Sequence, residues 1–381
     1  MVWMEKSTVS LRQEFVRLAN LDGANKRELC RRFGISPKTG YKWLARAGDA
    51  QPSALADRSR RPHTSPAHSS AATEQAVLGL RREHPAWGGR KIARRLADLD
   101  QARLAPSTVT HILRRHGLIT PEASQAAQPW QRFEHDAPNS LWQIDFKGHF
   151  ATLVGRCHGL TLLDDHSRFN LLLSALARTD TAPVQAQLIQ AFRRYGLPLR
   201  INADNGPPWG SPSAGGRSLS ELAIWLIRLG VRVSFSTPYH PQTNGKLERF
   251  HRSLDTEVIA GKYFKDHASV QRAFDAWRQT YNCERPHEAL AMAVPVERYR
   301  ASAVSYPERL KDIEYPSTDT VLTVGWNGII HFHGHKLRMS TALHRLPIGI
   351  RPDPHRDGVH DVYFCHQRFM QIDLHALAAD T

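Results

Sequence analysis

Three acidic side chains in the middle of the chain occupy positions that suit the binding of a divalent cation. Asp145 follows Trp142 and Ile144 in an apolar segment, where an unpaired charge is costly. Asp204 stands directly before an Asn-Gly turn, and Glu248 lies beside the apolar stripe of a predicted helix. Carboxylates that converge from separate elements suit a hard cation such as Mg²⁺ or Mn²⁺. Taken singly, an Asp before a turn and a Glu on a helix flank also have ordinary structural roles.

Two other groups of ligand-type residues favour simpler interpretations. Asp164 and Asp165 lie between two predicted strands, and we expect them to form a turn with Arg168 nearby for ion pairing. Three histidines alternate along a predicted C-terminal strand, so we expect them on one side of it, where a solvated face is favoured over a zinc site. These histidines are His331, His333 and His335.

The elements that must position the three carboxylates are predicted from residue 140 onward. Three consecutive strands, followed by helix, strand, helix, strand and helix, predict a mixed sheet flanked by helices. The predicted strands are 140–150, 157–169, 170–177, 197–206 and 231–238, and the helices are 181–196, 218–230 and 246–261. On the last helix the apolar stripe leaves Glu248 about a quarter-turn away, on a flank that can face the strand ends. That stripe comprises Leu247, Phe250, Leu254 and Val258.

Two helical modules precede this region, and the first has the pattern of a helix-turn-helix. A helix ends at Gly34, Ser36 can cap the next helix, and Pro37 suits its first position. Trp43 and Leu44 are predicted to face inward. The outward residues of this helix can lie in a DNA major groove, although an ordinary helical hairpin is the alternative. They are Lys38, Thr39, Lys42 and Arg46.

The second module, at 73–118, repeats this pattern. Ile92, Leu96 and Leu99 are predicted on one helical face, and Ser107 is predicted to cap a further helix. That helix would bury Val109, Ile112 and Leu113 and expose Thr108, His111, Arg114 and Arg115. Between the modules, the basic segment RSRRPH is either a solvated tether or an arm that follows phosphates or a minor groove. Its candidate DNA contacts are Arg58, Arg60 and Arg61.

Length and composition limit the classes of protein to consider. A chain of 381 residues is too long for one ordinary core, and 51 Lys and Arg against 36 Asp and Glu give a net charge of +15, which favours a nucleic acid partner. The four cysteines lie far apart and form neither a disulfide framework nor a zinc-finger spacing, which fits a reducing cytoplasm. We find no signal peptide and no apolar segment approaching about 18 residues, so we expect no membrane contact.

We therefore expect a multidomain α+β protein with tandem helix-turn-helix domains, a central mixed sheet and a C-terminal small β-barrel. The barrel is predicted from short strands with Gly turns after residue 300. The expected domains are helix-turn-helix at 1–48, linker at 49–72, second helix-turn-helix at 73–120, linker at 121–138, catalytic core at 139–300, linker at 301–318 and barrel at 319–381.

The motifs together resemble those of insertion-sequence transposases that share the catalytic core of retroviral integrases, which has the ribonuclease-H fold. The stretches that match are WQIDFKG, LDDHSRF, NADNGPPW, YHPQTNGKLERFHRSL and YNCERPHEAL. Upstream, DRSRRPH and HPAWGGRKI look like the N-terminal portion of one branch of these transposases. The resemblance covers about residues 10 to 375.

The resemblance implies a catalytic, metal-binding triad of Asp145, Asp204 and Glu248, separated by 59 and 44 residues. The second spacing is longer than in many integrases, and the segment GSPSAGGRS is a plausible local extension. The family activity would be two-metal phosphoryl transfer with Mg²⁺ or Mn²⁺: cutting at the element ends and joining the 3′-hydroxyl to target DNA. Further candidate DNA contacts are His240, Asn244, Lys246 and Arg252.

The expected partners are double-stranded DNA, as terminal inverted repeats and as target, and further copies of the chain, at least a dimer in the active complex. We expect a cytoplasmic, nucleoid-associated bacterial protein. A DNA-binding regulator with a vestigial core and a structure-specific nuclease without joining activity are the alternatives.

One position departs from the family pattern. The family often carries Lys or Arg seven residues after the glutamate, where this chain has Asp255. We expect Arg252, on the same helical face, to substitute for that cation, with Asp255 orienting it or standing at the rim of the site.

Overall fold

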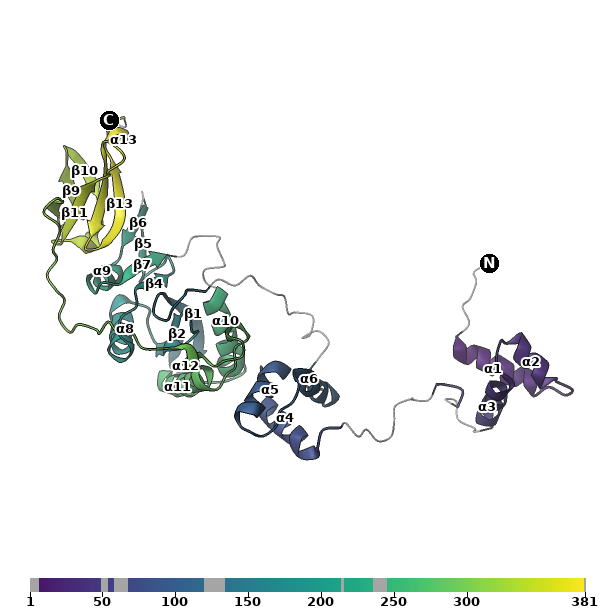
Figure 1. Ribbon diagram of the computed structural model, residues 1–381. Helices are drawn as coiled ribbons and strands as arrows, with labels where there is room; N and C mark the ends of the chain where they lie inside the picture. Colours follow the sequence, from purple (N-terminus) through teal and green to yellow (C-terminus); the bar gives the residue numbers. More distant parts are fainter. Residues whose placement is uncertain are drawn as a thin grey trace. The chain divides into compact units, whose positions relative to one another are not determined.

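The computed structural model describes residues 7–48, 54–57, 68–119, 134–213, 216–235 and 245–379. The chain divides into two compact units, Met1–His68 and Ser69–Thr381. Figure 1 shows the elements along the chain, with helices alone in the N-terminal modules and strands beginning only with β1.

The first unit is a three-helix module. Its helices are α1 (Thr8–Ala19), α2 (Lys26–Arg32) and α3 (Pro37–Ala47). The predicted start of α3 is confirmed, because Ser36 Oγ accepts a hydrogen bond from Thr39 N at 3.2 Å and Pro37 occupies the first turn. The helices cross closely: a Cβ on Gly40 would lie 2.5 Å from Cys30 Sγ, so only glycine fits there. Trp43 is buried, as predicted.

The second helical module comprises α4 (Ala71–Glu83), α5 (Gly89–Asp98) and α6 (Pro106–Arg115). Its apolar core contains the predicted inward residues of α6 together with Ile92 and Leu96. Leu99 is exposed, contrary to prediction, because α5 ends at Asp98 and Leu99 belongs to the turn that follows. The predicted Ser107 cap is also wrong: α6 begins at Pro106 after Ala105, with no side-chain cap.

The central region of the chain contains a five-stranded mixed sheet, as predicted. Its order is β3-β2-β1-β4-β7, with β1, β2 and β3 antiparallel and β1, β4 and β7 parallel. The strands are β1 (Trp142–Thr152), β2 (Gly155–Asp164), β3 (Asn170–Leu176), β4 (Arg200–Ala203) and β7 (Arg232–Phe235).

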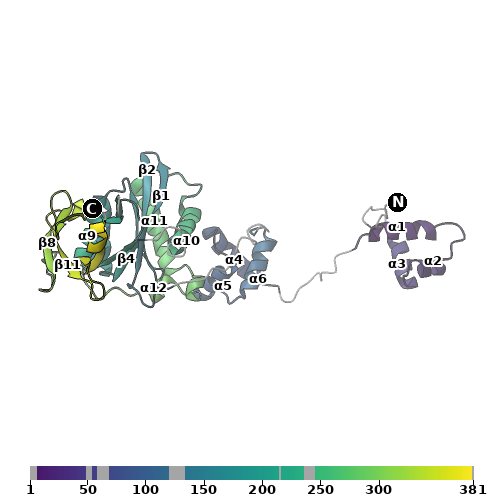
Figure 2. The ribbon, with the colours of Figure 1, turned by 90° about the horizontal axis from the view of Figure 1, so that it is seen from above.

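Helices cover both faces of this sheet. α8 (Thr181–Tyr195) and α9 (Glu221–Arg228) share one apolar cluster with Trp142 and Ile144, whereas α10 (Gly245–Leu254) and α11 (His267–Cys283) share a second cluster with residues of β2 and β3. Figure 2 shows α9 and α10 on opposite sides of the sheet. Since Trp142 and Ile144 face α8 and α9, the alternating residues Gln143 and Asp145 face α10.

Several features of this region were not predicted. A hairpin of β5 (Gly210–Ser213) and β6 (Gly216–Leu219) occupies the segment expected to be a local extension. The predicted helix over 246–261 instead ends as α10, and a π-helical segment, η2 (Asp255–Ile259), follows it. α11, the 3-10 segment η3 (Glu288–Leu290) and α12 (Pro295–Arg298) complete the region.

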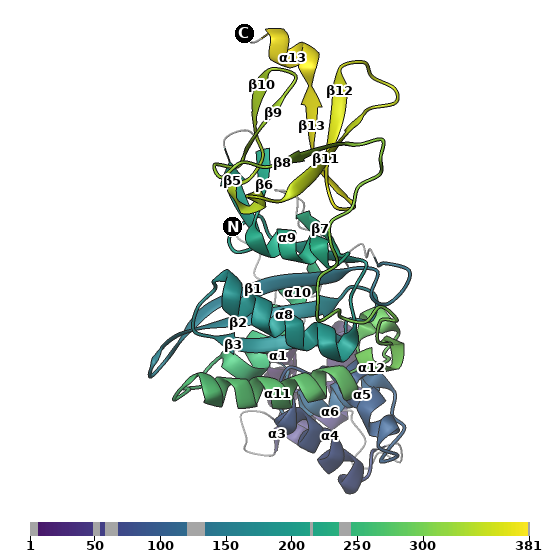
Figure 3. The same ribbon diagram turned by 90° about the vertical axis from the view of Figure 1, so that its left-hand side faces the viewer.

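The C-terminal region is an open sheet rather than the predicted closed barrel. Its order is β13-β12-β11-β8, and β9 and β10 form a separate two-stranded sheet (Figure 3). The strands are β8 (Thr320–Thr323), β9 (Ile329–Phe332), β10 (His335–Arg338), β11 (Pro347–Pro352), β12 (Val359–Phe364) and β13 (Gln367–Asp373), with η4 (Thr341–Leu343) and α13 (Leu374–Ala379).

The β9–β10 hairpin also corrects the interpretation of the three histidines. His331 lies on β9, His335 lies on β10, and His333 lies in the turn between them with a φ of 46°. The three side chains therefore do not share one side of a strand. The turn arises because His333 and Gly334 both adopt a positive φ, which reverses the chain after Phe332.

The C-terminal sheet covers an edge of the central one. Val233 N donates to Gln367 Oε1 at 2.8 Å, and Gln367 Nε2 donates to Val233 O at 2.9 Å. One side-chain amide thus satisfies both backbone groups of Val233 on the edge strand β7. Within the described ranges, no helix is long and apolar enough to cross a membrane.

Candidate active site

The register of β1 and β4 brings two of the three acidic residues to the same level. Trp142 pairs with Ile201 and Gln143 pairs with Asn202, an offset of 59 residues in each case. Asp204 follows Asp145 by the same 59 residues, so this register, if continued two positions past the printed pairs, would place the two aspartates opposite each other. The 59-residue spacing of the two aspartates therefore equals the offset between paired residues of the parallel strands β1 and β4.

Glu248 approaches from the helix that covers this face. Leu247, Phe250 and Leu254 are buried in the cluster that α10 shares with α11, as the apolar stripe predicted. Glu248 stands off that stripe and is exposed in the first turn of α10. The apolar side of α10 therefore packs against the core, and Glu248 lies on the flank of the helix.

Asp145 is a perturbed carboxyl. Its pKa is raised to about 6, chiefly by burial; the hydrogen bond from Phe146 N to Asp145 Oδ1 at 2.8 Å lowers the pKa, and the nearby charges of Asp204 and Glu248 raise it. Since each of the other two acids contributes, the three form one electrostatic group. A cation would relieve their mutual repulsion.

Three carboxylates are the type of ligand that a hard divalent cation prefers, but in this structure they do not surround a common position. Among the residues that the structure describes, no three His, Cys, Asp or Glu side chains are grouped closely enough to hold a metal ion as they stand. One oxygen of Asp145 and one of Asp204 instead accept from the next backbone N–H, at 2.8 and 2.7 Å.

Two neighbours of the carboxylates were missed from the sequence. Thr161 on β2 pairs directly with Asp145, and His251 Nε2 lies 3.2 Å from Thr161 Oγ1. Burial, and then the charge of Lys147, lower the pKa of His251 to about 4, so this imidazole is neutral at pH 7. No spacing signal marked His251, because it contacts the site only through the packing of α10 on β1 and β2.

Asp255 has a different partner from the one predicted. Lys147 Nζ lies 3.4 Å from Asp255 Oδ1, so the carboxylate is paired with a lysine of β1 rather than with Arg252. Lys147 follows Asp145 by two positions on the same strand. A positively charged side chain therefore lies near the candidate site, but it belongs to strand β1 rather than to helix α10.

Models of known families match most of this architecture. Integrase core domain models match residues 135–241 and 229–295, and an IS481 family transposase, C-terminal domain model matches 319–380. A helix-turn-helix domain model matches 11–63, and a homeodomain-like domain model matches 39–113. The chain belongs to the insertion-sequence transposases with an integrase-type core.

Individual proteins match parts of this chain, which spans less than two thirds of the length of the curated relatives it matches. An uncharacterized 31.7 kDa protein of insertion element IS407 from Burkholderia multivorans is 29% identical over 193 residues, which is 50% of this chain and 64% of that protein. The Pro-Pol polyprotein of Simian foamy virus type 3 is 30% identical over 149 residues, 38% of this chain and 12% of that protein. The HTLV-2 integrase catalytic core domain in complex with magnesium is 17% identical, with a TM-score of 0.31 over 43% of this chain and 99% of that one.

The candidate DNA contacts of α3 surround a buried tryptophan. Lys38 and Lys42 are exposed, whereas Thr39 and Arg46 are half-buried. The cationic groups of Lys42 and Arg46 each lie 5.0 Å from the centroid of the Trp43 ring. Stacking on the ring orders both side chains while leaving their charges available.

The candidate contacts of α6 differ in availability. His111 and Arg114 are exposed, Thr108 is half-buried, and Arg115 is paired with Glu74 of α4. Arg252 is exposed on α10. Five further candidates lie outside the described residues, namely Arg58, Arg60, Arg61, His240 and Asn244.

The turn predicted at Asp164 is confirmed, but its ion pairing differs. Asp164 Oδ1 accepts from Ser167 N at 2.8 Å and from Ser167 Oγ at 2.6 Å. Arg168, expected near the two aspartates, forms its ion pair with Glu134 at 3.6 Å. Asp165 pairs with Lys246 of α10.

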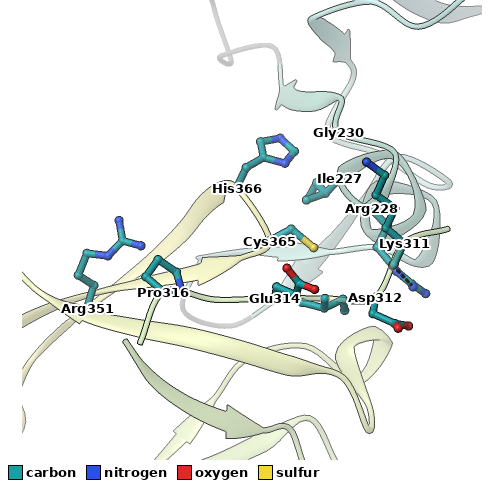
Figure 4. Close-up of a pocket in the computed structure, with 11 residues that line it drawn as sticks. Ile227, Arg228, Gly230, Lys311, Asp312, Glu314, Pro316, Arg351, Cys365 and His366 are labelled. Carbon is teal, nitrogen blue, oxygen red and sulfur yellow. Dashed lines mark hydrogen bonds between the residues drawn. The ribbon is translucent and has the colours of Figure 1, made fainter. Parts of the chain in front are cut away.

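A pocket of the protein lies elsewhere, between α9 and the C-terminal sheet. Figure 4 shows His366 and Cys365 across from Arg228, with Glu314 and Asp312 on the connecting segment. No member of the acidic triad is among the residues that line it. It is therefore separate from the candidate active site.

Proposed function

We propose that this transposase cuts at the ends of its insertion sequence and joins the exposed 3′-hydroxyl to target DNA. The observation that supports the proposal is that the β1–β4 register and the two aspartates share the same 59-residue offset, together with the influence of Asp204 and Glu248 on the raised pKa of Asp145. Glu248 completes the set from that helix.

The residues that would hold Mg²⁺ or Mn²⁺, two ions per active site, are these three carboxylates. When bound, the cations supply activation of the attacking oxygen and stabilisation of the charge that develops on phosphate. Asp145 would take part in both, because Asp204 and Glu248 are both near enough to contribute to its raised pKa. The carboxyl group of Asp145 must lose its proton before it can bind a cation, since a protonated carboxyl is a poor ligand.

Recognition of the ends is assigned to the two helix-turn-helix modules. The exposed face of α3 and the exposed His111 and Arg114 of α6 suit contacts with the edges of bases in a major groove. The net charge of +15 supplies attraction to phosphates that is independent of sequence. We propose terminal inverted repeats and target DNA as partners, at least a dimer of the chain as the active complex, and the bacterial cytoplasm, on the nucleoid, as its place of action.

A DNA-binding regulator with a vestigial core is the second candidate. A nuclease that cuts without joining is the third candidate. The retention of carboxyls at all three positions, with Asp145 perturbed by the other two, favours the active transposase.

A strand-transfer reaction separates these functions. Full-length protein is incubated with labelled DNA that carries the ends of its own element, an unlabelled target duplex and Mg²⁺. We expect labelled 3′ ends joined to the target. Cleaved ends without joined product would support the nuclease, and a bound but uncut substrate would support the regulator.

A further inference from the structure

A buried carboxylate outside the triad connects two elements that carry triad members. Asp165, in the turn after β2, is only 1% exposed. Its Oδ1 accepts from Gln143 Nε2 at 3.0 Å, and its Oδ2 accepts from His135 N at 3.0 Å. Lys246 Nζ forms an ion pair with the same Oδ1, and also donates to Asp165 O at 3.3 Å.

Each of the two side chains that contact Asp165 Oδ1 stands two positions before a triad residue in the sequence. Gln143 precedes Asp145 by two positions on β1, so both face the same side of the sheet. Lys246 precedes Glu248 by two positions in the first turn of α10. Asp165 is therefore the meeting point of the strand that carries one triad carboxylate and the helix that carries another.

The burial of this network makes it sensitive to the loss of any member. An ionised carboxylate away from water is costly unless it is paired and hydrogen-bonded. Lys246 is largely buried too, with its side chain 14% exposed. The ammonium group and Asp165 thus depend on each other for neutralisation.

We propose that Asp165 is a positioning residue, which holds β1 and the start of α10 together through Gln143 and Lys246 and thereby sets the separation of Asp145 from Glu248. The inference rests on the proposed function of that triad. It also gives Lys246 a role different from the DNA contact expected from the sequence, because its charge is directed at a buried acid.

Substitution of Lys246 tests the proposal. Lys246→Met keeps the length of the side chain and removes its charge, and Lys246→Arg restores the charge. Lys265→Met, at an exposed lysine before α11, is the matched control. The readouts are strand transfer and the binding of Mn²⁺ by the full-length protein, measured from the signal of free Mn²⁺ in electron paramagnetic resonance.

In Lys246→Met we expect Mn²⁺ binding weaker by about 10-fold, the size of effect seen when a group that orients metal ligands is lost. The concentration of Mg²⁺ needed for half-maximal joining should rise in parallel. Lys246→Arg should recover most of both, and Lys265→Met should match the wild type. A merely structural role would lower the fraction of folded protein without moving the Mn²⁺ affinity of the folded fraction.

Asp165→Asn gives a second route if Lys246→Met does not fold. It preserves side-chain volume and acceptor oxygen while weakening the hold on Lys246, and it should shift Mn²⁺ binding in the same direction. Wild-type affinity in the folded variants, with wild-type joining, would overturn the positioning role. Absence of Mn²⁺ binding and of joining in the unaltered protein would instead overturn the proposed function.

Discussion

At the scale of single residues, the environment of Asp145 decides how the candidate site responds to pH. The sequence identified this carboxylate because it interrupts an apolar strand, and the structure supplies the cause of its perturbation: burial and two acidic neighbours. Sequence alone did not identify Lys147, Thr161 or His251 as neighbours, because their contacts depend on how α10 packs on the sheet.

Metal binding is predicted to strengthen as the pH rises toward neutrality. The pKa of Asp145 rises on folding from 3.8 to about 6, so the folded protein holds this proton more tightly, and the group makes folding less favourable as the pH rises through that window. A cation must displace the same proton. Mn²⁺ affinity should therefore increase between about pH 5 and pH 7 and then level off.

Titrations of full-length protein with Mn²⁺ at a series of pH values measure this effect. Asp312→Asn, at an exposed acid, should reproduce the wild-type profile. An affinity that is constant over the same range would show that the raised pKa has no part in metal binding.

The pair of Lys147 and Asp255 leads to a second prediction at this scale. Lys147→Ala should weaken DNA binding and lower the slope of log affinity against log salt by about one, the effect of one lost phosphate contact. Asp255→Ala should strengthen binding, because it releases the cation from its 3.4 Å ion pair. Fluorescence anisotropy with a labelled duplex at several salt concentrations measures both.

Lys265→Ala controls for the loss of one positive charge elsewhere. If Lys147→Ala and Lys265→Ala gave equal changes, Lys147 would contribute only to net charge. If Asp255→Ala abolished joining without weakening binding, Asp255 would have a direct role in the site.

At the scale of elements, the sequence predicted the positions of helices more accurately than it predicted whether the C-terminal sheet closes into a barrel. The caps and apolar periodicity of α3 and α10 are local properties, so the sequence contained them. The closure of a barrel depends on pairing between strands far apart in the chain, which no local pattern specifies. β8 pairs with β11 on one side, and β9 and β10 pair with each other, so the sheet stays open. The π-helical segment after Leu254 likewise had no local signal.

The crossing of α5 and α6 gives a prediction about stability. A Cβ on Gly89 would lie 2.3 Å from Thr110 Oγ1 and 2.7 Å from Pro106 O, so the helices would have to separate. Gly89→Ala should lower the free energy of unfolding of the module by about 1–3 kcal/mol. Denaturant titration followed by circular dichroism measures it.

Gly79 provides the matched control, because it lies inside α4 with no atom within 4 Å of an added Cβ. Gly79→Ala should be neutral or stabilising by up to about 1 kcal/mol, from helix propensity alone. Equal effects of the two substitutions would show that the close crossing is not required.

At the scale of the whole molecule, the net charge of +15 and the two helical modules predict that DNA binding has separable components. Arg114 is exposed on α6, where it can contact bases. Arg60 belongs to the basic segment that is either a solvated tether or an arm that follows phosphates or a minor groove, and the prediction for it applies if that arm touches only phosphates. The order of the regions along the chain followed from composition and periodicity, but the exposure of each candidate contact required the structure.

Arg114→Ala should reduce discrimination between terminal-repeat DNA and random duplex, at a cost of about 1–3 kcal/mol for the specific sequence. Arg60→Ala should weaken binding to both sequences equally. Competition binding with full-length protein at fixed salt measures the ratio. A ratio that is unchanged in Arg114→Ala would remove this residue from the set that reads sequence.

The most direct test of the proposed activity replaces each triad carboxylate by its amide in the full-length protein. Asp145→Asn, Asp204→Asn and Glu248→Gln keep side-chain volume and remove the charge that would bind metal. At saturating Mg²⁺, with labelled element ends and a target duplex, each variant should bind the ends as the wild type does and form neither cleaved nor joined product. Joining near the wild-type level in any one of them would contradict the assignment of that residue to the active site.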